Sequence, residues 1–91
     1  GDEIGPWIER MVSLYRAGEI DQAVALLPGR IDTQWFQPLY DYPICNVRGR
    51  IKFQNADNSA PFPSVIVYLG ADQDGFIKTF KHLGPIIKRI A

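Results

Sequence analysis

The feature that most restricts the fold is a strict alternation over residues 45–53. The odd positions are apolar or glycine (Cys45, Val47, Gly49, Ile51, Phe53), and the even positions are polar (Asn46, Arg48, Arg50, Lys52). Side chains alternate between the two faces of a β-strand, so this period of two predicts a strand with one face on a core. Gly49 has no side chain to pack and predicts a bend or bulge. The chain is therefore expected to build a sheet.

Three other segments predict strands. Residues 23–27 form a continuous apolar run closed by Pro28 and Gly29. A short run without alternation is typical of a strand covered on both faces, as in the middle of a parallel sheet. Residues 64–69 are rich in β-branched side chains and end at Gly70, and residues 86–90 form a short last strand.

The first predicted helix covers residues 6–17. Its apolar residues recur at helical spacing: Trp7, Ile8, Met11, Val12, Leu14, Tyr15. Pro6 suits the first helical position, and Gly18 suits the end. In a chain of 91 residues, aromatic side chains are needed for the core, so Trp7 and Trp35 are expected there.

Two shorter helices are also expected. Asp32 or Thr33 would cap the first, which carries Trp35 and Phe36, and Pro38 would keep it short. The second begins at Asp74 as its cap and ends before Gly84-Pro85. Together the segments predict an α/β fold, a small mixed sheet with flanking helices, in one domain over residues 1–91.

Composition narrows the class of protein. Hydrophobic residues make up 46% and charged residues 22%, which favours a folded domain over disorder. No apolar run approaches the roughly 18 residues that a membrane span needs, and no signal peptide is apparent. The single cysteine, Cys45, cannot form an internal disulfide, so we expect a core thiol in a cytoplasmic protein. One cysteine and one histidine cannot supply a closed metal site.

Charge is unevenly distributed although the net charge is zero. Residues 1–41 contain seven acidic and three basic residues, and residues 42–91 contain three acidic and seven basic residues. The C-terminal half is therefore locally basic, which points weakly to a polyanion such as DNA.

Four short strings, in order, carry a resemblance to a known family. They are LLPGR at 26–30, DTQWF at 32–36, VRGRIKF at 47–53 and APFPS at 60–64. In this order and spacing they resemble the phage-type DNA N-6-adenine methyltransferase family, over about residues 4–70. Gly29 is a small departure, because alanine is more usual at that position.

The resemblance implies the C-terminal part of a Rossmann-like methyltransferase fold, with strands 45–53 and 64–69 paired antiparallel. In that family an acidic or Asn-Pro-Pro-Tyr tetrapeptide, which holds the target amino group, precedes the helix similar to residues 6–17. The S-adenosylmethionine-binding loop comes earlier still. Neither occurs in these residues, so no catalytic or cofactor-binding residue is carried over. S-adenosylmethionine is expected only for the complete enzyme.

Two functions therefore stay open. The chain is a fragment, remnant or split subunit of an S-adenosylmethionine-dependent adenine methyltransferase, not competent alone. Alternatively, it is a non-enzymatic module for oligomerisation or nucleic-acid binding that kept the fold. An intact small enzyme of unrelated chemistry is the least favoured hypothesis.

The candidate substrate- or DNA-binding residues form two groups. The first follows strand 23–27, at the end where open α/β sheets bind ligands; the second comprises a basic strand face and the loop after it. They are Arg30, Asp32, Thr33, Trp35, Arg48, Arg50, Lys52 and Phe62. The alternatives are a capped turn with a core tryptophan for the first group and a solvated strand face for the second. DNA binding is expected to be weak and salt-sensitive.

Assembly is the last expectation. A strand that is apolar on both faces needs neighbours, and in the resembled family one neighbour belongs to the N-terminal half. We therefore expect a homo-oligomer or pairing with that half. The contact would involve strand 23–27, the helix of Trp7 and Met11, or an exchanged strand 86–90.

Overall fold

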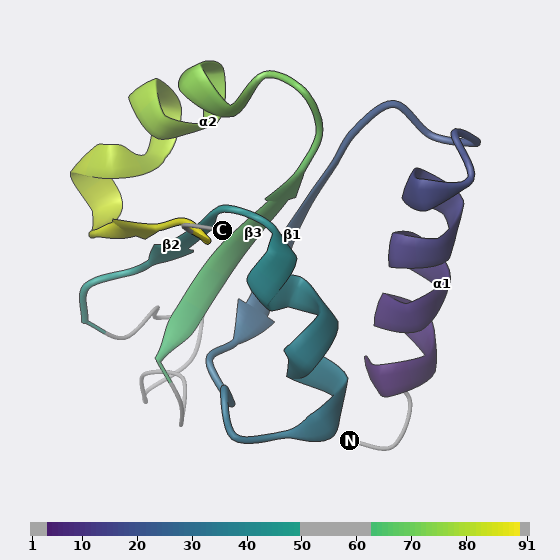
Figure 1. The fold of residues 1–91 in the computed structure, drawn as a ribbon. Coiled ribbons are helices and arrows are strands. Elements are labelled where there is room, and N and C mark those ends of the chain that lie inside the picture. Colours follow the sequence, from purple (N-terminus) through teal and green to yellow (C-terminus); the bar gives the residue numbers. More distant parts are fainter. Residues whose placement is uncertain (1–3, 50–62, 90–91) are drawn as a thin grey trace, which may run out of the picture.

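Four strands form one sheet in the order β1-β3-β2-β4 (Figure 1). The computed structural model describes residues 4–49 and 63–89. The elements are α1 (Ile4–Arg16), β1 (Ala23–Pro28), the 3₁₀ helix η1 (Gln34–Asp41), β2 (Ile44–Asn46), β3 (Ser64–Leu69), α2 (Gln73–Phe80), the 3₁₀ helix η2 (Lys81–Leu83) and β4 (Ile86–Ile87). The predicted α/β class with flanking helices is confirmed. Every pairing among the described strands is antiparallel, so within them the sheet is not mixed.

The central strand is β3, and all of its residues are buried. It pairs with β1 from Ala23↔Leu69 to Pro28↔Ser64 and with β2 from Ile44↔Val67 to Asn46↔Val65. The antiparallel pairing of β2 with β3 confirms that expectation for the residues described. Strand β4 pairs with β2 of the same chain.

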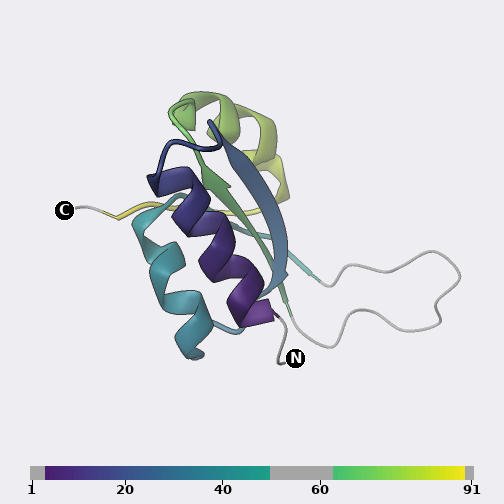
Figure 2. The same cartoon turned by 90° about the vertical axis from the view of Figure 1, so that its right-hand side faces the viewer.

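Helices cover both faces of the sheet (Figures 1 and 2). One face packs against α1 and η1, and its core includes Ile8, Phe36 and Leu39. The other face packs against α2, where the rings of Tyr68 and Phe76 stack with their centroids 5.2 Å apart. The apolar spacing of α1 and α2 thus produces two separate cores, one on each side of β3.

Strand 23–27 lies at an edge of the sheet, so its predicted central position in a parallel sheet is wrong. Its burial alternates: Ala25 and Leu27 are buried against α1, while Val24 and Leu26 are 54% and 57% exposed. Val24 and Leu26 lie opposite Tyr68 and Ile66, on the face that α2 covers farther along the sheet. The unbroken apolar run concealed this asymmetry because both faces carry similar residues.

The predicted strand 45–53 is shorter than its alternation suggests. Strand β2 ends at Asn46, and Val47 still packs on the α2 core as the alternation predicts. Gly49 has a φ of 72°, a left-handed conformation that favours glycine, which confirms the expected bend. Residues 50–53 lie outside the described part.

Pro38 does not stop the second helix, which continues as a 3₁₀ helix to Asp41. In this tighter geometry each N–H is aimed three residues back, as in the bond from Phe36 N to the Thr33 carbonyl. Proline removes one such bond without ending a short run. Thr33 occupies the cap position, but its side chain makes no capping hydrogen bond.

Two further expectations are wrong. Asp72, not Asp74, caps α2: its carboxylate accepts a hydrogen bond of 3.0 Å from Gly75 N. Trp7 is 54% exposed instead of lying in the core. Ile8, Met11 and the neighbouring Val12 already fill the buried stripe of α1, which leaves Trp7 on its flank.

Candidate functional site

One end of the sheet collects several of the predicted site segments. Strands β1 and β2 both run antiparallel to β3, so both end where β3 begins. Gly29 N donates to the Pro63 carbonyl at 2.6 Å, and Val47 N donates to the Ser64 carbonyl at 3.0 Å. Arg30 and Arg48 therefore follow strands that end at the same edge, with β3 between them.

The group after β1 is partly structural. Thr33 Oγ1 donates to the Arg30 carbonyl at 2.7 Å, which closes the turn between β1 and η1. Trp35 is half-buried and packs against the α1 core, as the alternative for this group predicted. Arg30 and Asp32 are exposed.

The basic group is described only at Arg48. This residue is exposed, its Nη1 donates to the His82 carbonyl at 3.3 Å, and its backbone N donates to the Leu83 carbonyl at 2.9 Å. Arg48 thus ties the end of β2 to η2. Arg50, Lys52 and Phe62 lie outside the described residues.

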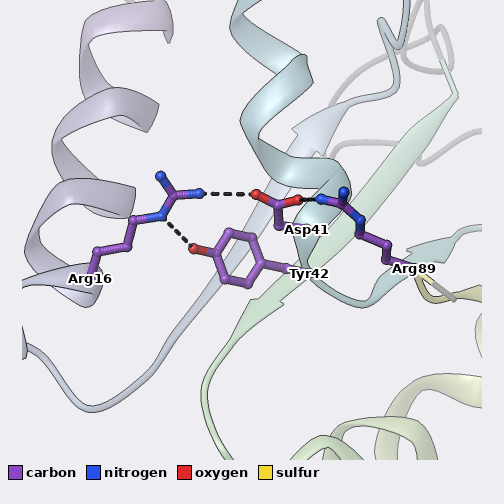
Figure 3. Close-up of polar contacts among 4 residues, drawn as sticks. All are labelled: Arg16, Asp41, Tyr42 and Arg89. Atoms are coloured by element: carbon purple, nitrogen blue, oxygen red, sulfur yellow. Dashed lines mark hydrogen bonds and ion pairs between the residues drawn. The ribbon is translucent and has the colours of Figure 1, made fainter. Parts of the chain in front are cut away.

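Sequence reasoning missed a polar cluster on the α1 side (Figure 3). Asp41 lies between two arginines: Arg16 Nη2 is 3.0 Å from its Oδ2, and Arg89 Nη1 contacts its Oδ1. Arg16 Nε also donates to the Tyr42 hydroxyl at 3.2 Å. This hydrogen bond, followed by Coulombic attraction to Tyr42 and Asp41, raises the pKa of Arg16. Residues far apart in sequence form the cluster, so no local sequence pattern could predict it.

Two hollows border η1. One, of about 240 Å³, is lined by Tyr40, Tyr42, Ile44, Ile87, Lys88 and Arg89. The other, of about 320 Å³, lies between α1 and η1 and is lined by Gly5, Pro6, Glu9, Gln34, Trp35 and Pro38. Both are open, and neither gathers a set of groups suited to acid–base or nucleophilic chemistry.

The only cysteine is buried between β2 and α2. Burial raises the pKa of the Cys45 thiol, although Arg48 opposes the effect. Cys45 Sγ is within reach of the carbonyls of Phe80 (3.5 Å) and Gly84 (3.7 Å), both hydrogen-bond acceptors. A buried thiol among acceptors is a core residue and not an activated nucleophile. Within residues 4–49 and 63–89, no group of three His, Cys, Asp or Glu side chains could hold a metal ion.

The free edge of β1 is the most distinctive surface. Because Gly29 N bonds to Pro63, the odd-numbered residues of β1 direct their backbone groups towards β3. Tyr68 N donates to the Pro43 carbonyl, so the even-numbered residues of β3 direct their backbone groups towards β2. The odd-numbered residues of β3 direct theirs towards β1. Val24 and Leu26 therefore direct both N–H and C=O away from the sheet, at an edge with no paired strand among the described residues.

The flank of α1 opposite η1 carries the exposed Trp7. Glu9 and Arg16 lie on the side of α1 that faces η1. At about 100° per residue, Trp7 lies roughly 160–180° around the helix from both. In Figure 2, η1, α1 and β1 follow one another from left to right, so the side of α1 that is opposite η1 lies towards β1. We call Trp7, Val24 and Leu26, with the outward backbone of β1, the open-edge surface.

Comparison with known proteins gives no identification: no family model, no curated protein and no solved structure matches the chain. In the part of the chain that the structure describes, the longest helices are too short or too polar to cross a membrane.

Proposed function

We propose that this chain is the C-terminal part of a phage-type, adenine-specific DNA methyltransferase and is not catalytically competent alone. The observation that carries the proposal is the open edge of β1. In the resembled family this strand has neighbours on both edges, and one of them comes from the N-terminal half. Within residues 4–49 and 63–89, β1 has one neighbour, β3, and the backbone groups on its other edge have no strand partner beside exposed Val24 and Leu26.

The placement of the resembling strings also supports the proposal. The first string forms the end of β1, the third follows β2, and the last ends at the first residue of β3. These three positions meet at one end of the sheet, through the bonds from Gly29 to Pro63 and from Val47 to Ser64. Strands β1 and β2 both end here, so Arg30 and Arg48 follow strands that end at the same side of the sheet.

In this proposal the N-terminal half supplies the donor site and the clamp for the target amino group. Methyl transfer requires the donor methyl and the acceptor nitrogen to be held near attack distance, which this chain does not do alone. This part completes the sheet and brings Arg30 and Arg48 to one end of it, where their charges favour the DNA backbone.

Methyl transfer to DNA tests the proposal. The chain is produced continuous with the polypeptide encoded directly before it, and the protein is incubated with mixed-sequence DNA and methyl-labelled S-adenosylmethionine. We expect labelled N6-methyladenine, and no labelling by residues 1–91 alone. Val24→Lys should abolish labelling because it disrupts the open edge, whereas Ile87→Lys, at the other edge, should not. A folded protein that methylates no adenine would contradict the proposal.

The alternative function is a non-enzymatic module. The open-edge surface favours it as well, since an apolar edge strand pairs with whatever strand is offered. An upstream reading frame without a donor-binding loop and a Pro-Pro-Tyr motif would select this alternative.

A further inference from the structure

We infer that two copies of this chain associate through β1, edge to edge and antiparallel, about a two-fold axis perpendicular to the sheet. The two four-stranded sheets then become one continuous sheet. The inference rests on the geometry of β1 and does not require the proposed function. A two-fold axis is the default for self-association.

The edge lacks the devices that normally prevent pairing. Natural edge strands are shortened, bulged or marked with charges, especially lysine. Strand β1 pairs with β3 through six consecutive positions without a bulge, and none of its residues is charged. Pro28 blocks pairing only at the last position, since it lacks an N–H.

The outward backbone groups of β1 complement themselves. A two-fold axis perpendicular to the sheet keeps the α2 face of both copies on the same side. Each even-numbered residue of β1 must therefore lie opposite an even-numbered residue of the second copy, and each odd-numbered residue opposite an odd-numbered one. Placing the axis at Ala25 sets Val24 opposite Leu26 of the second copy, and Leu26 opposite its Val24. Each of these pairs exchanges two backbone hydrogen bonds. Placing the axis at Leu26 instead sets Val24 opposite Pro28, which cannot donate to the Val24 carbonyl.

The side chains fit the same arrangement. On the α2 face, Val24 and Leu26 of one copy meet their counterparts, so exposed apolar surface on both copies is covered. On the opposite face the Trp7 flanks of the two α1 helices approach each other. Asp21 precedes β1 and Arg30 follows it. Antiparallel pairing therefore brings the acidic end of one strand towards the basic end of the other, which a parallel arrangement would not do.

Light scattering and sedimentation velocity across the micromolar range test the association. We expect a reversible species of twice the 10.3 kDa chain mass. Leu26→Lys should weaken association by roughly a hundredfold, because a two-fold axis places the substitution in the interface twice. Ile87→Lys is the matched control, since it removes an exposed isoleucine from the other edge and should leave the dimer intact. Circular dichroism verifies that both variants fold, and Val24→Lys serves if Leu26→Lys does not.

A chain that stays monomeric at all concentrations overturns the inference. So does a dimer that Leu26→Lys and Ile87→Lys weaken equally. Neither result bears on methyl transfer by the longer protein, in which the N-terminal half would occupy this edge in place of the second copy, so the two proposals fail separately.

Disulfide cross-linking tests the register. Directly opposite residues in an exchanged hydrogen-bonded pair have Cα atoms about 5.5 Å apart, within disulfide range, whereas diagonal neighbours are about 7–8 Å apart. An oxidised mixture of the Val24→Cys and Leu26→Cys chains should cross-link more than either chain alone. Equal or stronger cross-linking of one variant with itself would contradict this register.

Discussion

The two edges of this sheet are built in opposite ways. Strand β4 has two residues, and Lys88 and Arg89 follow it at once; Arg89 is also held by Asp41. Strand β1 has six residues, carries no charge and presents Val24 and Leu26 to solvent. A short, charge-flanked strand ends a sheet, while a long apolar strand continues it. The contrast indicates that a partner strand belongs beside β1 and not beside β4.

The contrast extends to the residues around each edge. On the β4 side, Asn46 N at the end of β2 donates to the Pro85 carbonyl, and Arg48 N donates to the Leu83 carbonyl, so the end of β2 and the residues after it hold the segment that leads into β4. On the β1 side, Val24 and Leu26 are more than half exposed. The β4 edge, a two-residue strand followed by charged residues, is called the closed edge, and the β1 edge, six uncharged residues with exposed Val24 and Leu26, is the open edge.

The largest effect is expected at Gly84, which leads into the closed edge. A Cβ on Gly84 would lie 1.7 Å from the Asn46 carbonyl oxygen. This backbone atom cannot move away without disturbing the pairing of β2 with the segment that leads into β4, where Asn46 N donates to the Pro85 carbonyl. Gly84→Ala should cost about 3 kcal/mol or more in the free energy of unfolding, measured by chemical denaturation. It should also open a second edge and promote aggregation.

Gly5→Ala is the control for that substitution. Its Cβ would lie 3.4 Å from Trp35 Cβ, an ordinary contact, and alanine favours the helix. The free energy of unfolding should change by less than about 1 kcal/mol. If Gly84→Ala is as mild as Gly5→Ala, the closed edge does not depend on this close approach.

A pair of proline substitutions separates the inner and outer sides of β1. Ala25 directs its N–H to β3, so Ala25→Pro should leave a carbonyl of β3 unpaired and cost about 1–3 kcal/mol of stability. Leu26 directs its N–H outwards, so Leu26→Pro should affect the fold of the single chain much less while weakening the dimer. Thermal unfolding and sedimentation report the two effects. Equal loss of stability in both variants would show that the outward assignment is wrong.

The elements were largely predictable from the sequence, but their neighbours were not. The helical spacing of residues 6–17 and the apolar run at 23–27 predicted α1 and β1 within a few residues. The same run gave no information about which strands lie beside it, because pairing is decided by residues distant in sequence. Trp7 was assigned to the core for the same reason, since helical spacing does not show which flank of a stripe stays uncovered.

The candidate site was predicted in part. The carboxyl-end rule was applied only to the group after strand 23–27, and it did not predict that Arg48 lies at the same end as Arg30, which follows from the antiparallel pairing of both strands with β3. It could not distinguish Thr33, which closes a turn, from Arg30, whose side chain is exposed. The cluster around Asp41 was beyond prediction because its members lie on three separate segments.

The smallest effect concerns Cys45, which lies opposite Ile86 and so reports on the closed edge. Its folded-state pKa is raised above the unfolded value by burial. This contribution to stability is therefore present below the unfolded pKa and is lost as the pH rises through the folded pKa. Between about pH 7 and pH 10, the parent chain should lose slightly more stability than Cys45→Ala.

Thiol labelling gives an independent measure of the same group. The native Cys45 should react with a thiol reagent far more slowly than the urea-unfolded chain at equal pH. Rapid labelling of the native chain would show that the β4 side opens freely, which would remove the difference between the two edges.

Residue-resolved amide hydrogen exchange of the chain at increasing concentration tests most directly whether β1 is an open edge whose outward N–H groups pair with a second copy. We predict that Ala25 and Leu27 amides are protected at every concentration, while Val24 and Leu26 amides exchange fast in dilute solution and become protected as the chain associates. Protection of Val24 and Leu26 that is already complete in the dilute monomer, or that never rises with concentration, would contradict the account.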